Sequence, residues 1–139
     1  MIILDTNIVS ELMKASPNRG LWHWFETVES QPLFLTAITV AELRYGACAL
    51  PQGKRRDQLN QTITQMLEGD FAESILDFNQ ASAEGYGILT AKLRSEGVTM
   101  SQNDAMIASI ALLHDASLVT RNIKDFEYCG IELVNPFSY

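Results

Sequence analysis

The sequence has few of the features that mark secreted, membrane-spanning or zinc-binding proteins. It contains two cysteines, and neither has a histidine or cysteine neighbour at the spacing of a zinc site. We expect free thiols, with Cys48 buried in its apolar segment, and no disulfide to Cys129. No apolar run approaches the roughly 20 residues of a membrane helix, and the first residues lack the basic region of a signal peptide. The expected location is the cytoplasm.

The residues of common nucleophilic and phosphate-binding sites are also scarce. The two histidines, His23 and His114, stand alone, and no serine or cysteine lies at a suggestive spacing from either. This argues against a catalytic triad. Gly85 and Gly87 lie within a predicted helix, so they do not form a phosphate-binding loop.

The chain also lacks an excess of positive charge. It has 10 lysines and arginines against 17 acidic residues, a net charge of −7. Such a protein has no general attraction to nucleic acid, so binding of RNA or DNA must rest on local cations and metal ions. The one dense basic run, 54–56, is most simply the solvated start of a helix. Single cations are scattered elsewhere: Arg44, Lys92, Arg94, Arg121 and Lys124.

Short apolar runs alternate with longer amphipathic segments over one domain, residues 1–139. The runs predict strands at 2–4, 33–35, 75–76 and 118–119, with a weaker fifth at 131–134. The segments predict helices at about 18–29, 39–50, 54–68, 79–94 and 102–114. This order is typical of an α/β fold with a mainly parallel sheet of about five strands flanked by helices.

Three isolated carboxylates stand where we expect a strand to give way to a helix. Asp5 follows the first strand, Glu42 lies one turn into a helix, and Asp104 lies at the start of another. Taken singly, each is most simply a helix cap. Asp5 is a candidate N-cap, and the Thr39-x-x-Glu42 and Ser101-x-x-Asp104 spacings are those of a capping box and its acidic counterpart.

Taken together, the same residues predict a metal site. The ends of parallel strands meet at one edge of the sheet, so the three carboxylates should converge there. Converging anions repel one another unless a cation lies between them, and Mg²⁺ or Mn²⁺ prefers oxygen ligands. Such an ion activates water against a phosphodiester. Asn122, after the predicted strand at 118–119, supplies a fourth polar position.

Five segments, in order, resemble the signatures of the PIN-domain ribonucleases, in particular the VapC/FitB-type toxins. They are Ile3-Leu4-Asp5-Thr6-Asn7, the stretch 36–46 around Glu42, the stretch 104–108, the stretch 120–126, and Asn135-Pro136-Phe137. The likeness covers nearly the whole chain. It implies a PIN-like three-layer α/β fold and an Mg²⁺- or Mn²⁺-dependent endoribonuclease.

The resemblance also implies roles for single residues. Asp5, Glu42 and Asp104 would be catalytic metal ligands, and Asn122 would hold a fourth catalytic position that is often Asp in the family. The amide keeps a carbonyl oxygen but removes a negative charge. The candidate substrate contacts are Arg44, Arg121 and Lys124, and the candidate supporting residues are Thr6, Asn7 and Asp125.

The family further implies a biological setting. Its toxins cleave RNA, in several cases tRNA, and are often homodimers. A cognate VapB/FitA-like antitoxin neutralises them in a larger hetero-oligomer. Its C-terminal segment covers the active site, while its N-terminal domain binds operator DNA. An acidic groove invites a basic side chain from that segment.

Two alternatives remain open from the residues. The carboxylates could only cap helices in a binding or scaffold module, which predicts no divalent-ion binding. Asp5 could instead be the nucleophile of an aspartyl phosphotransfer domain. Against this, Asn7 stands where a phosphatase has its second aspartate.

Overall fold

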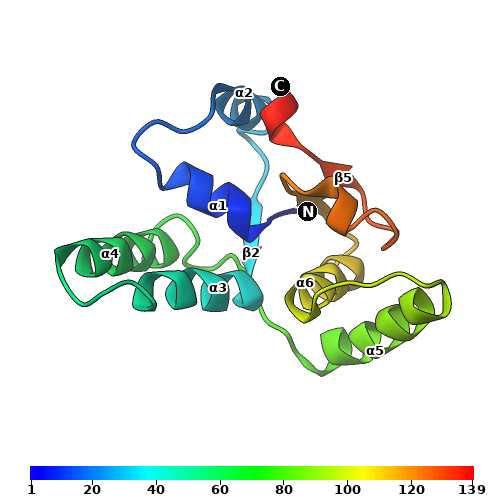
Figure 1. The fold of residues 1–139 in the computed structure, drawn as a ribbon. Coiled ribbons are helices and arrows are strands. Elements are labelled where there is room, and N and C mark those ends of the chain that lie inside the picture. Colours follow the sequence, from blue (N-terminus) through cyan, green and yellow to red (C-terminus); the bar gives the residue numbers. More distant parts are fainter.

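A five-stranded parallel sheet forms the centre of the molecule, with helices on both faces (Figure 1). The computed structural model describes all 139 residues. The strand order is β3-β2-β1-β4-β5, and every pairing is parallel. The strands are β1 (Ile2–Leu4), β2 (Leu33–Thr36), β3 (Ile75–Leu76), β4 (Ser117–Val119) and β5 (Leu133–Val134). The predicted fold class and all five strands are therefore confirmed.

Six α-helices and two short 3₁₀ helices connect the strands. They are α1 (Thr6–Leu12), α2 (Arg19–Thr27), α3 (Ala37–Cys48), α4 (Lys54–Glu68), α5 (Gln80–Ser95), α6 (Gln102–Leu113), η1 (Ile123–Asp125) and η2 (Pro136–Ser138). Five match the predicted helices within a few residues. Helix α1 lies outside the predicted amphipathic segments because its seven residues are too few to show a periodicity. No helix is both long and apolar enough to cross a membrane.

The sheet separates two hydrophobic cores. Because side chains of a strand alternate between its faces, Ile2 and Leu4 pack into one core and Ile3 into the other. The first core contains apolar side chains of α1 to α4, among them Trp24. The second contains those of α5 and α6. The central strand β1 is thereby buried on both sides, which fixes the position of the residue that follows it.

The two tryptophans and the two cysteines divide between core and surface. Trp24 is 3% exposed and Trp22 is 52% exposed, as expected for residues two apart on one helix. Both cysteines are free, which confirms the absence of a disulfide. The predicted burial of Cys48 is wrong: it is exposed and Cys129 is buried. On the last turn of α3, Ala47 faces the core and the next residue points away from it.

The C-terminal segment closes the edge of the first core. Helix α2 packs against η2, and a side chain at Gly20 would lie 2.8 Å from the Tyr139 carbonyl oxygen. Glycine at this position lets the two backbones approach. The contact brings Phe137 beneath Arg121, whose guanidinium carbon lies 4.7 Å from the ring centroid.

Candidate active site

Asp5 lies at the carboxyl end of the central strand β1 and is 5% exposed. It is the N-cap of α1, as predicted: Oδ1 accepts a 2.8 Å hydrogen bond from the Thr6 backbone N–H. Oδ2 accepts a 2.8 Å hydrogen bond from the Thr120 hydroxyl and a 3.3 Å bond from the Asn7 amide. The carboxylate is thus both a cap and a fixed group at the edge of the sheet.

Glu42 reaches the same edge from helix α3. Its Oε1 accepts a 2.7 Å hydrogen bond from the Thr6 hydroxyl, and its Oε2 accepts a 3.4 Å bond from the Asn103 amide. The predicted capping box is wrong. Helix α3 begins at Ala37, and the hydroxyl of Thr36 caps it by accepting from the backbone N–H of Thr39 at 3.2 Å. Glu42 therefore lies beyond the first turn, where its carboxylate is available to the site.

Asp104 lies in the first turn of α6. Ser101 is the N-cap, as predicted, and its hydroxyl accepts a 3.2 Å hydrogen bond from the Asp104 backbone N–H. The prediction of a strand-to-helix corner at this position is wrong, because α6 follows α5 through the connection 96–101. Asp104 thus reaches the edge of the sheet from a helix-to-helix corner. Burial raises the pKa of Asp104, and the charges of Asp125 and Glu42 raise it further, against the hydrogen bond from Ser101.

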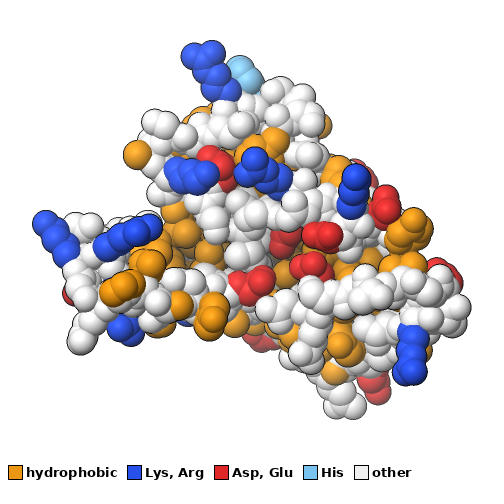
Figure 2. Space-filling model, in the orientation of Figure 1, with side chains coloured by type: hydrophobic (Ala, Val, Ile, Leu, Met, Phe, Trp, Pro, Cys, Tyr) orange, Lys and Arg blue, Asp and Glu red, His pale blue; other side chains and the backbone are white.

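The three carboxylates share one electrostatic environment. Burial raises the pKa of Asp5 from 3.8 to about 6, and the negative charges of Asp104 and Glu42 add to this effect. The hydrogen bonds from Thr120 and the Thr6 backbone act in the opposite direction. Figure 2 shows acidic side chains gathered in the middle of the face that Figure 1 displays, between α1, α3 and α6. Burial and the neighbouring charges therefore disfavour the ionised form of Asp5 in the metal-free protein.

The donor chemistry of this edge fits a hard divalent cation. The charged groups that influence Asp5 are carboxylates, and no histidine or cysteine is among them. Such oxygen donors suit Mg²⁺ or Mn²⁺ better than zinc. A positive ion here would offset the burial and repulsion that raise the Asp5 pKa. No three acidic, histidine or cysteine side chains approach each other as closely as ligands of one ion do, so the cage is open in this conformation.

The two residues considered for the fourth position lie differently. Asn122 is exposed, its side chain does not cap η1, and its backbone N–H donates a 3.0 Å hydrogen bond to the Thr120 hydroxyl. Asp125, in η1, lies close enough to raise the pKa of Asp104. Asn122 thus contacts the site through its backbone N–H, and Asp125 acts on the site through its negative charge.

The three candidate substrate contacts have different surroundings. The guanidinium of Arg44 donates to the Asn60 carbonyl oxygen at 3.0 Å and to the Thr64 hydroxyl at 2.8 Å, which joins α3 to α4. Arg121 stacks on the C-terminal segment, and its backbone N–H donates to Asn7 Oδ1 at 3.2 Å. Lys124 is exposed and lines a cavity with Asp104. Only Arg121 and Lys124 lie next to residues of the acidic edge.

The basic run 54–56 forms the first turn of α4, as expected for a helix start. Its side chains are exposed or partly exposed.

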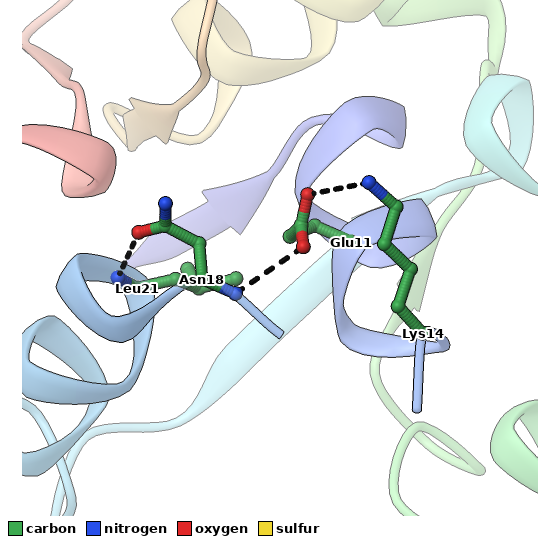
Figure 3. A network of polar contacts seen from close by, with 4 residues as sticks. All are labelled: Glu11, Lys14, Asn18 and Leu21. Atoms are coloured by element: carbon green, nitrogen blue, oxygen red, sulfur yellow. Dashed lines mark hydrogen bonds and ion pairs between the residues drawn. The ribbon is translucent and has the colours of Figure 1, made fainter. Parts of the chain in front are cut away.

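Sequence reasoning missed a buried carboxylate next to the site. Glu11 of α1 accepts a 3.0 Å hydrogen bond from the Lys14 ammonium and a 3.2 Å bond from the Asn18 backbone N–H (Figure 3). Asn18 in turn caps α2 by accepting from the Leu21 N–H at 3.2 Å. The hydrogen bond and charge of Lys14, the Asn18 N–H and the charge of Arg121 lower the pKa of Glu11, against its burial. The i,i+3 spacing of Glu11 and Lys14 was the sequence feature that could have predicted this ion pair.

Two hydroxyl groups beneath the site were also not anticipated. Thr39 is fully buried, and its hydroxyl lies 2.9 Å from that of Thr6. Thr120 is fully buried and donates to Asp5. Both contacts join residues far apart in the sequence, so no local sequence pattern predicts them.

Comparison with known proteins identifies the family. Residues 2–129 match the model of the PIN domain. The chain is 36% identical over 138 residues to VapC ribonuclease Y4jK of Sinorhizobium fredii, covering 99% of each chain. It is 32% identical over 137 residues to toxin FitB of Neisseria gonorrhoeae, again covering 99% of each. Its fold is similar to the crystal structure of FitAcB from Neisseria gonorrhoeae, with a TM-score of 0.90, 32% identity and 100% of both chains covered.

These matches run along almost the entire chain, and the structural match extends over the whole fold described above. The protein belongs to the PIN-domain family.

Proposed function

We propose that this chain is an Mg²⁺- or Mn²⁺-dependent endoribonuclease and the toxin of a type II toxin–antitoxin module. Residues 1–139 act as one PIN domain, and the protein works in the cytoplasm. The observation that carries the proposal is the buried Asp5 carboxylate, whose pKa of about 6 reflects burial and the nearby charges of Asp104 and Glu42. The ribonuclease and toxin named among the relatives support the same activity.

Asp5, Glu42 and Asp104 hold the ion in this proposal. A bound Mg²⁺ or Mn²⁺ would supply an activated water and stabilise the negative charge that develops at the phosphate. Asn122 takes the fourth position through its side-chain oxygen, and the charge of Asp125 adds to the attraction for a cation.

Neighbouring hydroxyl and amide groups orient these ligands. Thr120 and the Thr6 backbone fix the two oxygens of Asp5, while the Thr6 hydroxyl and Asn103 fix those of Glu42. Partners of this kind strengthen metal binding by limiting the rotation of the ligands. Asn7 supports both Asp5 and the backbone of Arg121.

The basic side chains bind the substrate locally, since the net charge of −7 gives no general attraction to RNA. Arg121 and Lys124 bind phosphates beside the acidic edge. Arg44 acts on the substrate only indirectly, because its guanidinium is already hydrogen-bonded to helix α4.

A cognate VapB/FitA-like antitoxin neutralises the enzyme. A cavity of about 300 Å³ is lined by residues of α1, α3 and α4, which include Thr6, Glu42, Arg55 and apolar side chains such as Leu59 and Ile63. An apolar antitoxin segment with a basic side chain suits this lining. The toxin is a homodimer within a larger complex, and it reaches operator DNA only through the antitoxin.

The experiment is an RNA-cleavage assay with purified, antitoxin-free protein on total RNA and tRNA. We expect cleavage with Mg²⁺ or Mn²⁺, its loss with EDTA, its return when the ion is restored, and its inhibition by the product of the adjacent antitoxin gene. A folded protein that cleaves no RNA with either ion would contradict the proposal.

One second candidate has support from the structure. Asp5 and Ser101 cap helices, and the carboxylates form no closed cage, as in a binding module whose acidic residues are structural. That function predicts that EDTA and divalent ions change neither activity nor stability.

A further inference from the structure

A cavity of about 270 Å³ lies beside the acidic edge, between the α5–α6 connection and the segment around η1. Figure 1 shows both segments near the start of α6. Asp104 forms part of the cavity wall, so the space adjoins the proposed metal ligands. Pockets for drug-sized ligands begin at about 300 Å³. This cavity therefore suits a single flat ring that belongs to a larger substrate.

The floor of the cavity is apolar and uncharged. It is formed by side chains that include Leu93, Met100 and Cys129. The Cys129 sulfur lies 3.6 Å from that of Met100, and Leu93 is 2% exposed, so the floor is well packed. Such a surface offers van der Waals contact to the face of a ring, while its edges remain free for polar groups.

An aromatic side chain stands at the rim. Tyr128 lines the cavity, is 57% exposed and takes part in none of the aromatic pairs of the chain. It precedes the buried Cys129, which anchors its backbone. Exposed aromatic rings beside a cleft stack on nucleobases. Tyr128 is thus a preformed stacking surface at the opening.

The polar part of the lining matches a nucleotide rather than an apolar ligand. Lys124 is the one cation of the lining, beside the carboxylates of Asp104 and Asp125, and Thr99 and Ser101 contribute hydroxyl groups. A lysine binds phosphate, and hydroxyl groups bind the donors and acceptors of a base edge. The cavity therefore combines a stacking ring, polar groups for a base edge and a phosphate contact.

We propose that this cavity binds an unpaired nucleobase of the RNA strand next to the scissile phosphate. Tyr128 stacks on the base and Lys124 binds a neighbouring phosphate. The inference rests on the proposed ribonuclease function. A base stacked within a duplex cannot enter the cavity, so the subsite takes a base that is unstacked from its neighbours.

The test compares binding of oligomers with and without bases. Fluorescently labelled single-stranded poly(A), poly(C), poly(G) and poly(U) ribo-oligomers and an abasic ribo-oligomer of equal length are titrated with the full chain. We expect the wild type to bind at least one homopolymer on the order of 10-fold more tightly than the abasic oligomer. Tyr128→Ala should remove this advantage, while Tyr128→Phe should retain it because the ring is kept.

Two further variants separate the contributions. Tyr45→Ala removes a ring that is 77% exposed on α3 and outside the cavity lining, so it should behave as the wild type. Lys124→Ala should weaken homopolymers and the abasic oligomer equally, because the phosphate contact does not depend on the base. Circular dichroism confirms that each variant is folded.

The outcomes distinguish the subsite from the enzyme activity. The inference is overturned if Tyr128→Ala binds every oligomer as the wild type does, or if the wild type binds the abasic oligomer as tightly as all four homopolymers. A base-dependent affinity that Tyr128→Ala abolishes, in a protein that cleaves no RNA, would support the subsite and contradict the ribonuclease function. Cleavage that does not depend on Tyr128 or on the base would do the reverse.

Discussion

Asp5→Asn is expected to lower the rate of Mg²⁺-dependent RNA cleavage on the order of 100- to 1,000-fold, the usual cost of removing one fixed group that stabilises transition-state charge. Asp104→Asn should have an effect of the same order. Each substitution keeps the shape of the side chain but removes a negative charge from the proposed metal ligands. The measurement is the single-turnover cleavage rate of the antitoxin-free protein at saturating Mg²⁺.

The matched control is Asp115→Asn. Asp115 is exposed, precedes β4 and therefore lies at the opposite edge of the sheet from the three carboxylates. Its backbone φ of 50° is one that asparagine tolerates. This variant should cleave at the wild-type rate. If Asp5→Asn and Asp104→Asn both cleaved RNA at the wild-type rate, the assignment of Asp5 and Asp104 as catalytic residues would be wrong.

In the metal-free protein, Asp5→Asn should also gain stability relative to the wild type as the pH rises to neutral. The Asp5 pKa is raised from 3.8 to about 6 by burial and by its acidic neighbours. A group with a raised folded-state pKa contributes its stability below the unfolded value and loses it as the pH rises through the folded value. The loss spans about two pKa units, or about 3 kcal/mol. Asparagine does not ionise, so the variant does not undergo this loss of stability.

The measurement is urea unfolding of wild type and Asp5→Asn in EDTA, from below pH 4 to above pH 7. Over this range the free energy of unfolding of the variant should rise by about 3 kcal/mol relative to that of the wild type. Glu11→Gln provides a control of opposite sign, because its hydrogen bond to Lys14 lowers the Glu11 pKa. That variant should lose stability relative to wild type as the pH rises. A pH-independent difference for Asp5→Asn would refute the electrostatic account.

The fold and the place of Asp5 followed from local patterns. Short apolar runs identified the five strands because their side chains pack against the two cores, and alternation with helices implied parallel pairing. Parallel strands end at one edge, which is why Asp5 could be placed there from sequence. The capping functions of Asp5 and Ser101 were likewise local, since each cap contacts a residue at most three positions away.

The errors concern contacts that join distant segments. Thr39 was predicted to cap α3, but Thr36 is the cap and the Thr39 hydroxyl instead contacts that of Thr6, 33 positions away. The prediction that Asp104 stands at a strand-to-helix corner was wrong, because α6 follows α5 through the connection 96–101. The contact between Asn103 and Glu42 links α6 to α3 and has no signature in either segment. Tertiary packing decides such positions.

The most direct test of the central claim, that Asp5, Glu42 and Asp104 hold a divalent ion, is calorimetric titration of the purified protein with Mn²⁺. We expect the wild type to bind, and Asp5→Asn, Glu42→Gln and Asp104→Asn each to bind at least about 10-fold more weakly. Asp115→Asn should bind as the wild type does. The claim would be contradicted if the folded wild type bound no Mn²⁺, or if all three variants bound Mn²⁺ as tightly as the wild type does.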